Sequence, residues 1–293
     1  MAGDPTTGDD RTVVDQRFEA IHVGFGPHHV VIRSGAPTVS EDLRGAFGPM
    51  LADGPVGIEA GTIVAVPDAD GVRVGSGADA ATTRVVDSDW APREAYHEAI
   101  KLLMRARAEL VWLHAGVAAW QDQACLFVGP SGQGKSTLVA ALLDRGWSYF
   151  SDEIGAIDAA AGCVHPFPLA PRRRVHEGAL LAQDDLAAIR RLPKVDVDFA
   201  PEAIGREPRP VAGIYFLDFD PGSDGVRERT ATPAESVLAM LGNSLALEPD
   251  RKREIASLAQ LAGRVPCRRL AYPGADIAAA WVHEAAVATS QTR

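Results

Sequence analysis

Residues 126–158 read LFVGPSGQGKSTLVAALLDRGWSYFSDEIGAID, and this stretch decides the expected fold. An apolar run ends at Val128, a loop of the form G-x-x-x-x-G-K-[ST] fills residues 129–136, and a helical segment of small and apolar residues follows. Strand, glycine-rich loop and helix in that order are the context in which this pattern binds phosphate. The sequence therefore predicts a phosphate-binding loop, and nucleotide binding is its first functional consequence.

The residue types of this loop suit a phosphate ligand. Glycines let backbone N–H groups turn inward, and the N-terminus of the following helix adds a positive dipole. The Lys135 ammonium can neutralise phosphate oxygens, and the Ser136 hydroxyl can ligate Mg²⁺. The loop residues expected to bind the nucleotide are Gly129, Ser131, Gly132, Gln133, Gly134, Lys135, Ser136 and Thr137.

An acidic pair, Asp152 and Glu153, follows the strand expected at residues 147–150. A right-handed crossover makes this strand parallel to the strand before the loop, so the acids fall on the same edge of the sheet as the loop. A carboxylate there can bind Mg²⁺ or accept a proton from an attacking hydroxyl. Asp218 competes for this role, because it ends the apolar run GIYFL in the manner of a Walker B strand. Asp152 is preferred because it follows the first crossover, and the parts played by Glu153 and Asp218 stay open.

The rest of the chain divides into three predicted parts. Residues 1–14 are polar and acidic and predict a flexible tail. Short β-prone runs between Gly, Pro and Asp turns predict a small, mostly β region over residues 15–88. Over residues 89–293 strands alternate with helices, one of which opens with a capping box of Thr232 and Glu235. This alternation predicts an α/β catalytic domain built around a central sheet.

Composition limits the class of protein. The chain has 293 residues and a formal net charge of -10, which argues against an extended nucleic-acid surface, since such surfaces need cations. No run of about 18 apolar residues and no secretory pattern is present, so we expect no membrane association and a cytoplasmic location. Cys125, Cys163 and Cys267 are widely spaced and fit neither a disulfide framework nor a zinc site. They are expected to be reduced, buried thiols.

The segment LHAGVAAWQDQACLFVGPSGQGKSTLVAALLDRGWSYFSDEIGAID resembles the catalytic core of the HPr kinase/phosphorylase superfamily. The shared features are a histidine upstream of the loop, a short helix that ends at Arg-Gly, and a strand that closes on an acidic pair. The resemblance implies a P-loop kinase core related to phosphoenolpyruvate carboxykinase, and γ-phosphoryl transfer from a nucleotide to a serine hydroxyl. By position it implies that His114 lies near the transferred phosphate, that Lys135 and Ser136 bind phosphate and metal, and that Asp152 activates the hydroxyl. Glu153 stands where the family commonly has a second Asp, and its longer side chain could still serve a metal although it places its oxygens farther out.

Two features depart from the family pattern. The Glu-x-Arg-Gly-x-Gly run, which the family associates with the reverse, phosphate-consuming reaction, is absent from the sequence. Residues 15–88 have no match to the regulatory domain of the true HPr kinases. The chain therefore resembles a divergent HPr-kinase-related serine kinase, and some relatives of that kind phosphorylate ribosomally made precursor peptides. Related kinases commonly assemble, so a homo-oligomer is compatible with this interpretation.

The resulting hypothesis is a kinase that uses ATP, or another nucleoside triphosphate, with Mg²⁺ and phosphorylates a serine on a protein or peptide. Arg173, in the cluster PRRR, is a candidate for binding the γ-phosphate or an acidic acceptor through its guanidinium fork. Three alternatives stay open: a small-molecule kinase or carboxykinase-like phosphoryl transferase, a non-catalytic nucleotide-binding module that regulates a partner, and an ABC-type ATPase. The last is disfavoured because no LSGGQ-like signature follows the loop.

Overall fold

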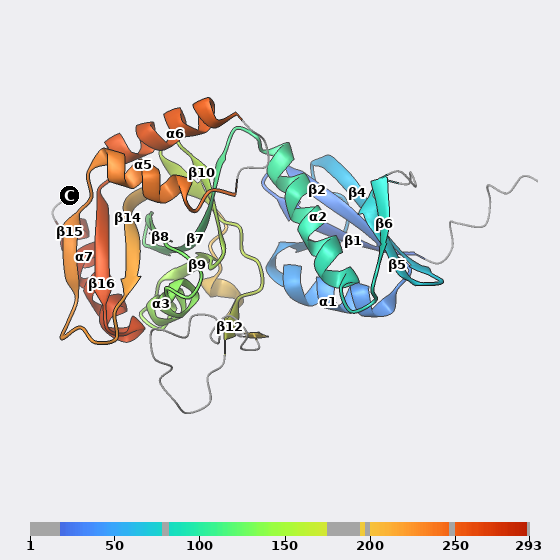
Figure 1. The fold of residues 1–293 in the computed structure, drawn as a ribbon, viewed down its shortest axis with the longest axis horizontal. Coiled ribbons are helices and arrows are strands. Elements are labelled where there is room, and N and C mark those ends of the chain that lie inside the picture. Colours follow the sequence, from blue (N-terminus) through green and yellow to red (C-terminus); the bar gives the residue numbers. More distant parts are fainter. Residues whose placement is uncertain (1–17, 78–81, 175–193, 197–199, 246–249, 292–293) are drawn as a thin grey trace, which may run out of the picture. The chain divides into compact units, whose positions relative to one another are not determined.

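The structure is a computed structural model that describes residues 18–77, 82–174, 194–196, 200–245 and 250–291. The expected tail, residues 1–14, lies outside the described residues. The chain forms two compact units (Figure 1), the first made of Met1–Ala46 and Leu51–Ala106 and the second of Phe47–Met50 and Arg107–Arg293.

The first unit is a six-stranded sheet with two helices, and its strand order is β3-β1-β2-β4-β5-β6. Helix α2 lies against β2, β4 and β5. The strands are β1 (Glu19–Phe25), β2 (His28–Ser34), β3 (Leu51–Ala52), β4 (Ile58–Asp68), β5 (Gly71–Ser76) and β6 (Thr83–Val86), and the helices are α1 (Pro37–Phe47) and α2 (Ala91–Ala106).

Helix α2 packs differently from the sequence-based expectation, which began the second domain at residue 89. Ala91, Ala95, Ala99 and Leu103 recur at intervals of four residues and are all buried. This apolar stripe faces the sheet of the first unit, so α2 belongs with that unit. The first unit also contains α1, which the β-prone runs did not predict.

The second unit is a mixed α/β fold around a sheet of strand order β11-β10-β7-β8-β14-β16-β15, in which β9 also pairs with β7. A separate small sheet pairs β12 with β13. The strands are β7 (Val111–Trp120), β8 (Gln123–Val128), β9 (Ser148–Ser151), β10 (Ile154–Asp158), β11 (Cys163–His165), β12 (Arg172–Arg174), β13 (Lys194–Asp196), β14 (Arg209–Phe219), β15 (Arg227–Thr230) and β16 (Cys267–Tyr272). The helices are α3 (Lys135–Leu143), α5 (Pro233–Leu241), α6 (Arg251–Arg264) and α7 (Ala275–Gln291).

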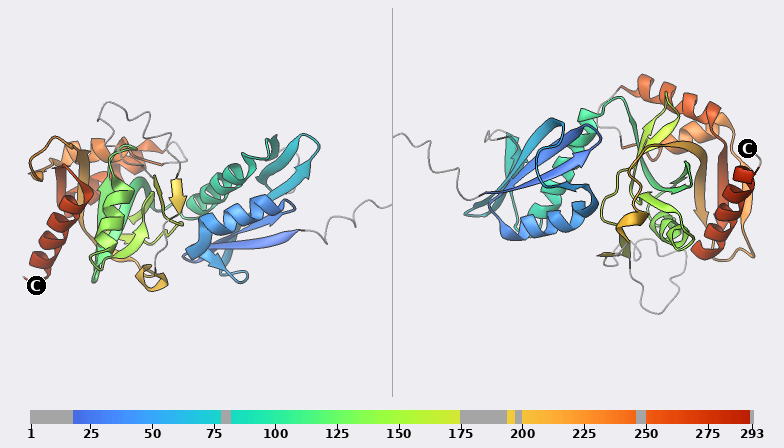
Figure 2. Two further views of the ribbon diagram at one scale, coloured as in Figure 1. Left: turned by 90° about the horizontal axis from the view of Figure 1, so that it is seen from below. Right: turned by 180° about the vertical axis from the view of Figure 1, so that it is seen from behind.

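Helices cover both faces of this sheet (Figure 2). Leu138 of α3 and Val282 of α7 belong to the buried cluster on one face, which we call the α3 face. Met240 of α5 and Leu261 of α6 belong to the cluster on the other face. The predicted alternation of strands and helices around a central sheet is therefore confirmed at the level of a mixed α/β fold.

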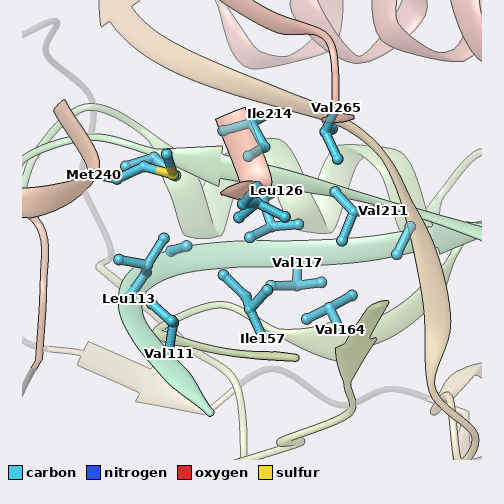
Figure 3. Close-up of a cluster of buried hydrophobic side chains, with 14 of the residues drawn as sticks. Val111, Leu113, Val117, Leu126, Ile157, Val164, Val211, Ile214, Met240 and Val265 are labelled. Atoms are coloured by element: carbon cyan, nitrogen blue, oxygen red, sulfur yellow. The ribbon is translucent and has the colours of Figure 1, made fainter. Parts of the chain in front are cut away.

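Strand β11 pairs with both β10 and β14, so five strands, β11, β10, β7, β8 and β14, close into a ring. The ring is filled by apolar side chains that alternate along each strand (Figure 3). Val117 of β7, Leu126 of β8, Ile157 of β10, Val164 of β11 and Ile214 of β14 are among them. The intervening residues of these strands therefore point outward, and this alternation places the site residues described below.

Local signals in the sequence account for several element ends. The Thr232 hydroxyl caps α5 by accepting a hydrogen bond from the Glu235 backbone N–H, and the Glu235 carboxylate accepts one from the Thr232 backbone N–H. These two bonds confirm the predicted capping box. Gly146, at a φ of 83°, follows α3 in the left-handed region that ends helices. Among the described residues, no helix combines the length and the apolar composition needed to span a bilayer.

Candidate functional site

The glycine loop, residues 129–136, connects the end of β8 to the start of α3. Gly132 and Gly134 have φ values of 97° and 78°, in the left-handed region that favours glycine. A Cβ atom on Gly134 would lie 2.6 Å from the hydroxyl oxygen of Tyr272. Both the backbone conformation and the available space therefore demand glycine immediately before the first residue of α3.

The Lys135 side chain fills the inside of the glycine loop. It is only 6% exposed, and its Nζ donates hydrogen bonds to the carbonyl oxygens of Gly129 at 2.6 Å and Pro130 at 3.1 Å. These hydrogen bonds connect the Lys135 ammonium at the end of the loop to carbonyl oxygens at its start, so the loop closes around a positive charge. Ser136 is half-buried in the first turn of α3, whereas Thr137 is exposed.

Two hydrogen bonds that Gln133 accepts attach the glycine loop to neighbouring strands. Its Oε1 accepts a hydrogen bond from the backbone N–H of Phe219 at 2.6 Å, and its carbonyl oxygen accepts one from the Tyr272 hydroxyl at 2.5 Å. Burial, with a smaller contribution from the Asp218 carboxylate, raises the pKa of Tyr272 above its ordinary value. The hydroxyl therefore remains a donor, and the loop is anchored at the ends of β14 and β16.

Pairing along β7 brings the acidic pair next to the glycine loop. On one edge of β7, Ala115 pairs with Val128, the last residue of β8. On the other edge, Val117 pairs with Ser151, the last residue of β9. Strands β8 and β9 both run antiparallel to β7 and so are parallel to each other, with β7 between them. Two strand spacings, about 10 Å, therefore separate the start of the loop from the start of the acidic turn.

The acidic turn, residues 151–154, is held by hydrogen bonds within the turn and by one from Tyr149 of β9. The Ser151 hydroxyl accepts hydrogen bonds from the backbone N–H groups of Glu153 at 3.3 Å and Ile154 at 2.9 Å. The Tyr149 hydroxyl lies 3.0 Å from Oδ1 of Asp152 and 2.9 Å from the carbonyl oxygen of Leu169. Tyr149 packs in the cluster on the α3 face, so the Asp152 carboxylate, only 9% exposed, lies on the face that carries α3 and the loop.

His114 lies on the same outward face of β7 as Gly116. A Cβ atom on Gly116 would lie 3.6 Å from Cβ of Lys135, which places that part of β7 directly beneath the start of α3. His114 Nδ1 lies 3.0 Å from the carbonyl oxygen of Glu153. A carbonyl only accepts, so Nδ1 carries the hydrogen, and in the neutral ring the lone pair is on Nε2. His114 thus joins the acidic turn to the strand beneath Lys135.

Glu153 contributes mainly through its backbone in this structure. Its carbonyl oxygen accepts hydrogen bonds from His114 and from the backbone N–H of Ala115 at 3.2 Å, and its side chain is half-buried. Asp218 also lies beside the loop, one residue before Phe219. Leu217 and Phe219 pack on the α3 face, so strand alternation directs the exposed Asp218 side chain away from that face. Of Asp152 and Asp218, Asp152 has its carboxylate on the face that carries the loop.

The structure therefore groups His114, Lys135, Ser136, Asp152 and Glu153 at one edge of the sheet. The side chain of Arg173 lies outside the described part of the structure, although the backbone of β12 comes close to α3. The sequence did not reveal three supporting residues. They are Tyr149, Ser151 and Tyr272, whose hydroxyls hold the acidic turn and the loop.

No family model and no curated protein matches the sequence. Among solved structures, the chain is similar to the Hpr(Ser) kinase/phosphatase from Coxiella burnetii, with 13% sequence identity and a TM-score of 0.35. The alignment covers 61% of this chain and 98% of that chain.

We expect Tyr149→Phe to lower kcat for the reaction at this site by a few-fold to about tenfold, with little change in nucleotide affinity. The Tyr149 hydroxyl carries one hydrogen, which the Asp152 carboxylate and the buried Leu169 carbonyl share as acceptors. Its removal takes away the group that orients Asp152 and should also cost about 1–3 kcal/mol of stability. Steady-state kinetics and denaturant unfolding measure the two effects. Tyr215→Phe is the matched control, because that buried tyrosine has no hydroxyl hydrogen bond to a described residue. Equal kinetic losses in both variants would remove the positioning role.

Proposed function

We propose that this protein is a nucleotide- and Mg²⁺-dependent kinase that transfers the γ-phosphoryl group to a serine hydroxyl of a protein or peptide. The observation that carries the proposal is the pairing along β7, which puts the acidic turn and the glycine loop at one edge of the sheet. A phosphate-binding loop alone supports nucleotide binding. A buried, hydrogen-bonded carboxylate on the same face adds the group that phosphoryl transfer to a hydroxyl requires.

In this proposal each residue has a separate task. Lys135 and the backbone N–H groups of the glycine loop neutralise charge on the phosphoryl oxygens. Asp152 accepts a hydrogen bond from the acceptor serine, orients its oxygen towards the γ-phosphorus and takes its proton as the new O–P bond forms. The bond to the bridging oxygen of the nucleotide breaks in the same transfer, and the nucleoside diphosphate leaves.

The residues present suit Mg²⁺, which prefers oxygen ligands. The Ser136 hydroxyl, the Asp152 carboxylate and the Glu153 carboxylate are the oxygen donors that would hold it. Bound there, Mg²⁺ supplies neutralisation of the phosphate charge. The longer Glu153 side chain starts from a backbone fixed by His114, so it has reach without moving the turn.

His114 has a positioning role in the proposal. It donates from Nδ1 to the Glu153 carbonyl oxygen and so fixes the turn that carries Asp152. Its strand position, two residues from the glycine beneath Lys135, puts its ring near the phosphate region. The resemblance of residues 113–158 to HPr kinases supports the serine acceptor, and the acceptor itself is part of the proposal.

Incubation of the full chain with γ-labelled ATP, Mg²⁺ and a peptide library tests the proposal. We expect label on serine-containing peptides, loss of transfer when EDTA removes Mg²⁺, and no label when alanine replaces the acceptor serine. Mass spectrometry locates the phosphate. Transfer only to small hydroxyl or carboxyl compounds would refute the peptide acceptor, and nucleotide binding without any transfer would refute the kinase.

A further inference from the structure

A second group of chemically active side chains lies in the second unit, away from the glycine loop. Asp158, Cys163 and His165 each offer a ligand atom, and these atoms all lie within 4.8 Å of one another. Among the described residues, these three form the group of His, Cys, Asp or Glu side chains whose ligand atoms lie close enough together to hold a metal ion. We call it the β10–β11 trio.

The hairpin geometry explains why the three side chains meet. Asp158 of β10 is the direct cross-strand partner of Cys163 of β11. His165 lies two residues after Cys163, so strand alternation puts it on the same face. The partner of His165 is Ala156, whose small side chain leaves room beside the imidazole.

The same alternation separates the trio from the core. Ile157 and Val164, the residues between trio members, are fully buried inside the strand ring. Asp158, Cys163 and His165 are all half-buried on the outside of the ring, where an ion from solvent can reach them. Asp158 is also held in place, because its Oδ1 accepts a hydrogen bond from the backbone N–H of Ala161 at 2.8 Å.

We propose that Asp158, Cys163 and His165 form a binding site for a borderline divalent metal ion, with Zn²⁺ the best fit. Thiolate, imidazole and carboxylate are the three ligand types that Zn²⁺ accepts, at bond lengths of about 2.0–2.3 Å. Ligand atoms around a tetrahedral zinc are about 3.3–3.7 Å apart, so small side-chain rotations close the trio around the ion. Mg²⁺ and Ca²⁺ are disfavoured because they prefer sites made of oxygen alone.

The charges of the site balance. Binding releases the Cys163 thiol proton to solvent as the sulfur–metal bond forms, so thiolate and carboxylate together neutralise a divalent ion. Arg107 lies near the trio but is ion-paired with Glu109, and this pair adds no net charge. Three protein ligands leave a fourth position for water or an exogenous ligand.

The trio is separate from the proposed kinase site. Asp158 at the trio lies four residues further along the extended strand β10 than Ile154 at the acidic turn, a span of about 13 Å. The proposed Mg²⁺ ligands include no sulfur, so a spectroscopic signal from a metal–thiolate bond distinguishes the two places. Failure of the kinase proposal therefore leaves the trio proposal intact, and the reverse is also true.

Cobalt substitution of the untagged full chain tests the proposal. After reduction and treatment with a chelator, titration with Co²⁺ should produce a thiolate-to-cobalt charge-transfer band that equimolar Zn²⁺ abolishes. Cys163→Ser should abolish the band, and Asp158→Asn and His165→Gln should each weaken Co²⁺ binding by about tenfold or more. Cys267→Ser is the matched control, because that cysteine is buried elsewhere and should leave the band unchanged. Absence of the band in the wild type, or its persistence in Cys163→Ser, overturns the site.

A measurement on the wild-type protein alone covers the case in which a variant fails to fold. Cys163 is half-buried whereas Cys125 and Cys267 are buried, so a thiol reagent should modify Cys163 first. Zn²⁺ should slow this modification by at least about tenfold, because the metal-bound sulfur is blocked. Mg²⁺ should not slow it. Equal rates with and without Zn²⁺ would contradict metal binding at Cys163.

Discussion

Asp152→Asn should lower kcat for phosphoryl transfer by about 10²–10⁴-fold, the range that a positioned general base contributes. Nucleotide affinity should stay within a few-fold of wild type, because Lys135 and the loop N–H groups are untouched. Asparagine has nearly the same shape as aspartate and its Oδ1 can still accept from the Tyr149 hydroxyl, so the acidic turn should keep its conformation. The loss therefore reports the missing carboxylate, as base and as metal ligand, and not a collapsed site.

Transfer from γ-labelled ATP and nucleotide titration by calorimetry give the two quantities for Asp152→Asn. Asp122→Asn, in the turn between β7 and β8, is a control acid far along β7 from the acidic turn and should behave as wild type. Asp218→Asn decides between the two acids that the sequence left in competition. If Asp218→Asn abolishes transfer and Asp152→Asn does not, the catalytic assignment moves to β14.

Gly134→Ala should weaken nucleotide binding by about 10²-fold, the loss expected when one or two charge-assisted hydrogen bonds to phosphate are broken. At a φ of 78° any side chain is strained, and the new Cβ would lie 2.6 Å from the Tyr272 hydroxyl oxygen. Relief of that contact must move either the loop or the strand end that anchors it. Either movement turns the N–H groups away from the phosphate.

Two further variants separate the causes of this loss. Gly162→Ala has a similar φ of 71° but open space around its Cβ, so it measures conformational strain without a steric clash and should not affect nucleotide binding. Tyr272→Phe removes the clashing oxygen, and the next ring atom lies 3.7 Å from the Cβ position, an ordinary contact. The double variant should regain part of the affinity. Wild-type affinity in Gly134→Ala alone would exclude the loop as the phosphate site.

The core elements of the second unit were predictable because each has a strong local signal. The apolar runs of β7, β8 and β14, the glycine loop and the capping box of α5 all depend on neighbouring residues. The order of the strands was not predictable in the same way. The order depends on pairing between segments that are distant in the sequence. Such pairing puts β7 between β8 and β9 and closes a ring between β11 and β14.

The two helices of the first unit show a different limit. Val39, Leu43 and Phe47 of α1 are buried at intervals of four residues, a helical spacing that was present in the sequence but lay among β-prone runs. The sequence predicted helix α2, but it did not predict that the helix packs on the sheet of the first unit. An amphipathic stripe indicates that one face of a helix is buried but not which sheet that face covers.

The candidate site was predictable where a motif carries it and not where distant residues support it. Lys135, Ser136 and Asp152 follow from the spacing of the loop and the acids. Tyr272 reaches the loop from 139 residues beyond Gln133, and no local pattern reveals such a contact. The sequence analysis also did not predict the trio. It considered the spacing of the cysteines alone, whereas the trio combines one aspartate, one cysteine and one histidine.

The acidic turn is fixed by main-chain atoms and by the side chains of its neighbours, not by the side chain at position 153. The Glu153 carbonyl and N–H make the contacts, with His114, Ala115 and Ser151 as partners. The conformation of the turn therefore does not depend on which side chain stands at position 153. Asp, Glu or a neutral residue there would change the length and charge of the side chain but would leave the hydrogen bonds that position Asp152 in place. In the proposed kinase, substitutions at position 153 should therefore change Mg²⁺ binding more than they change the conformation of the acidic turn.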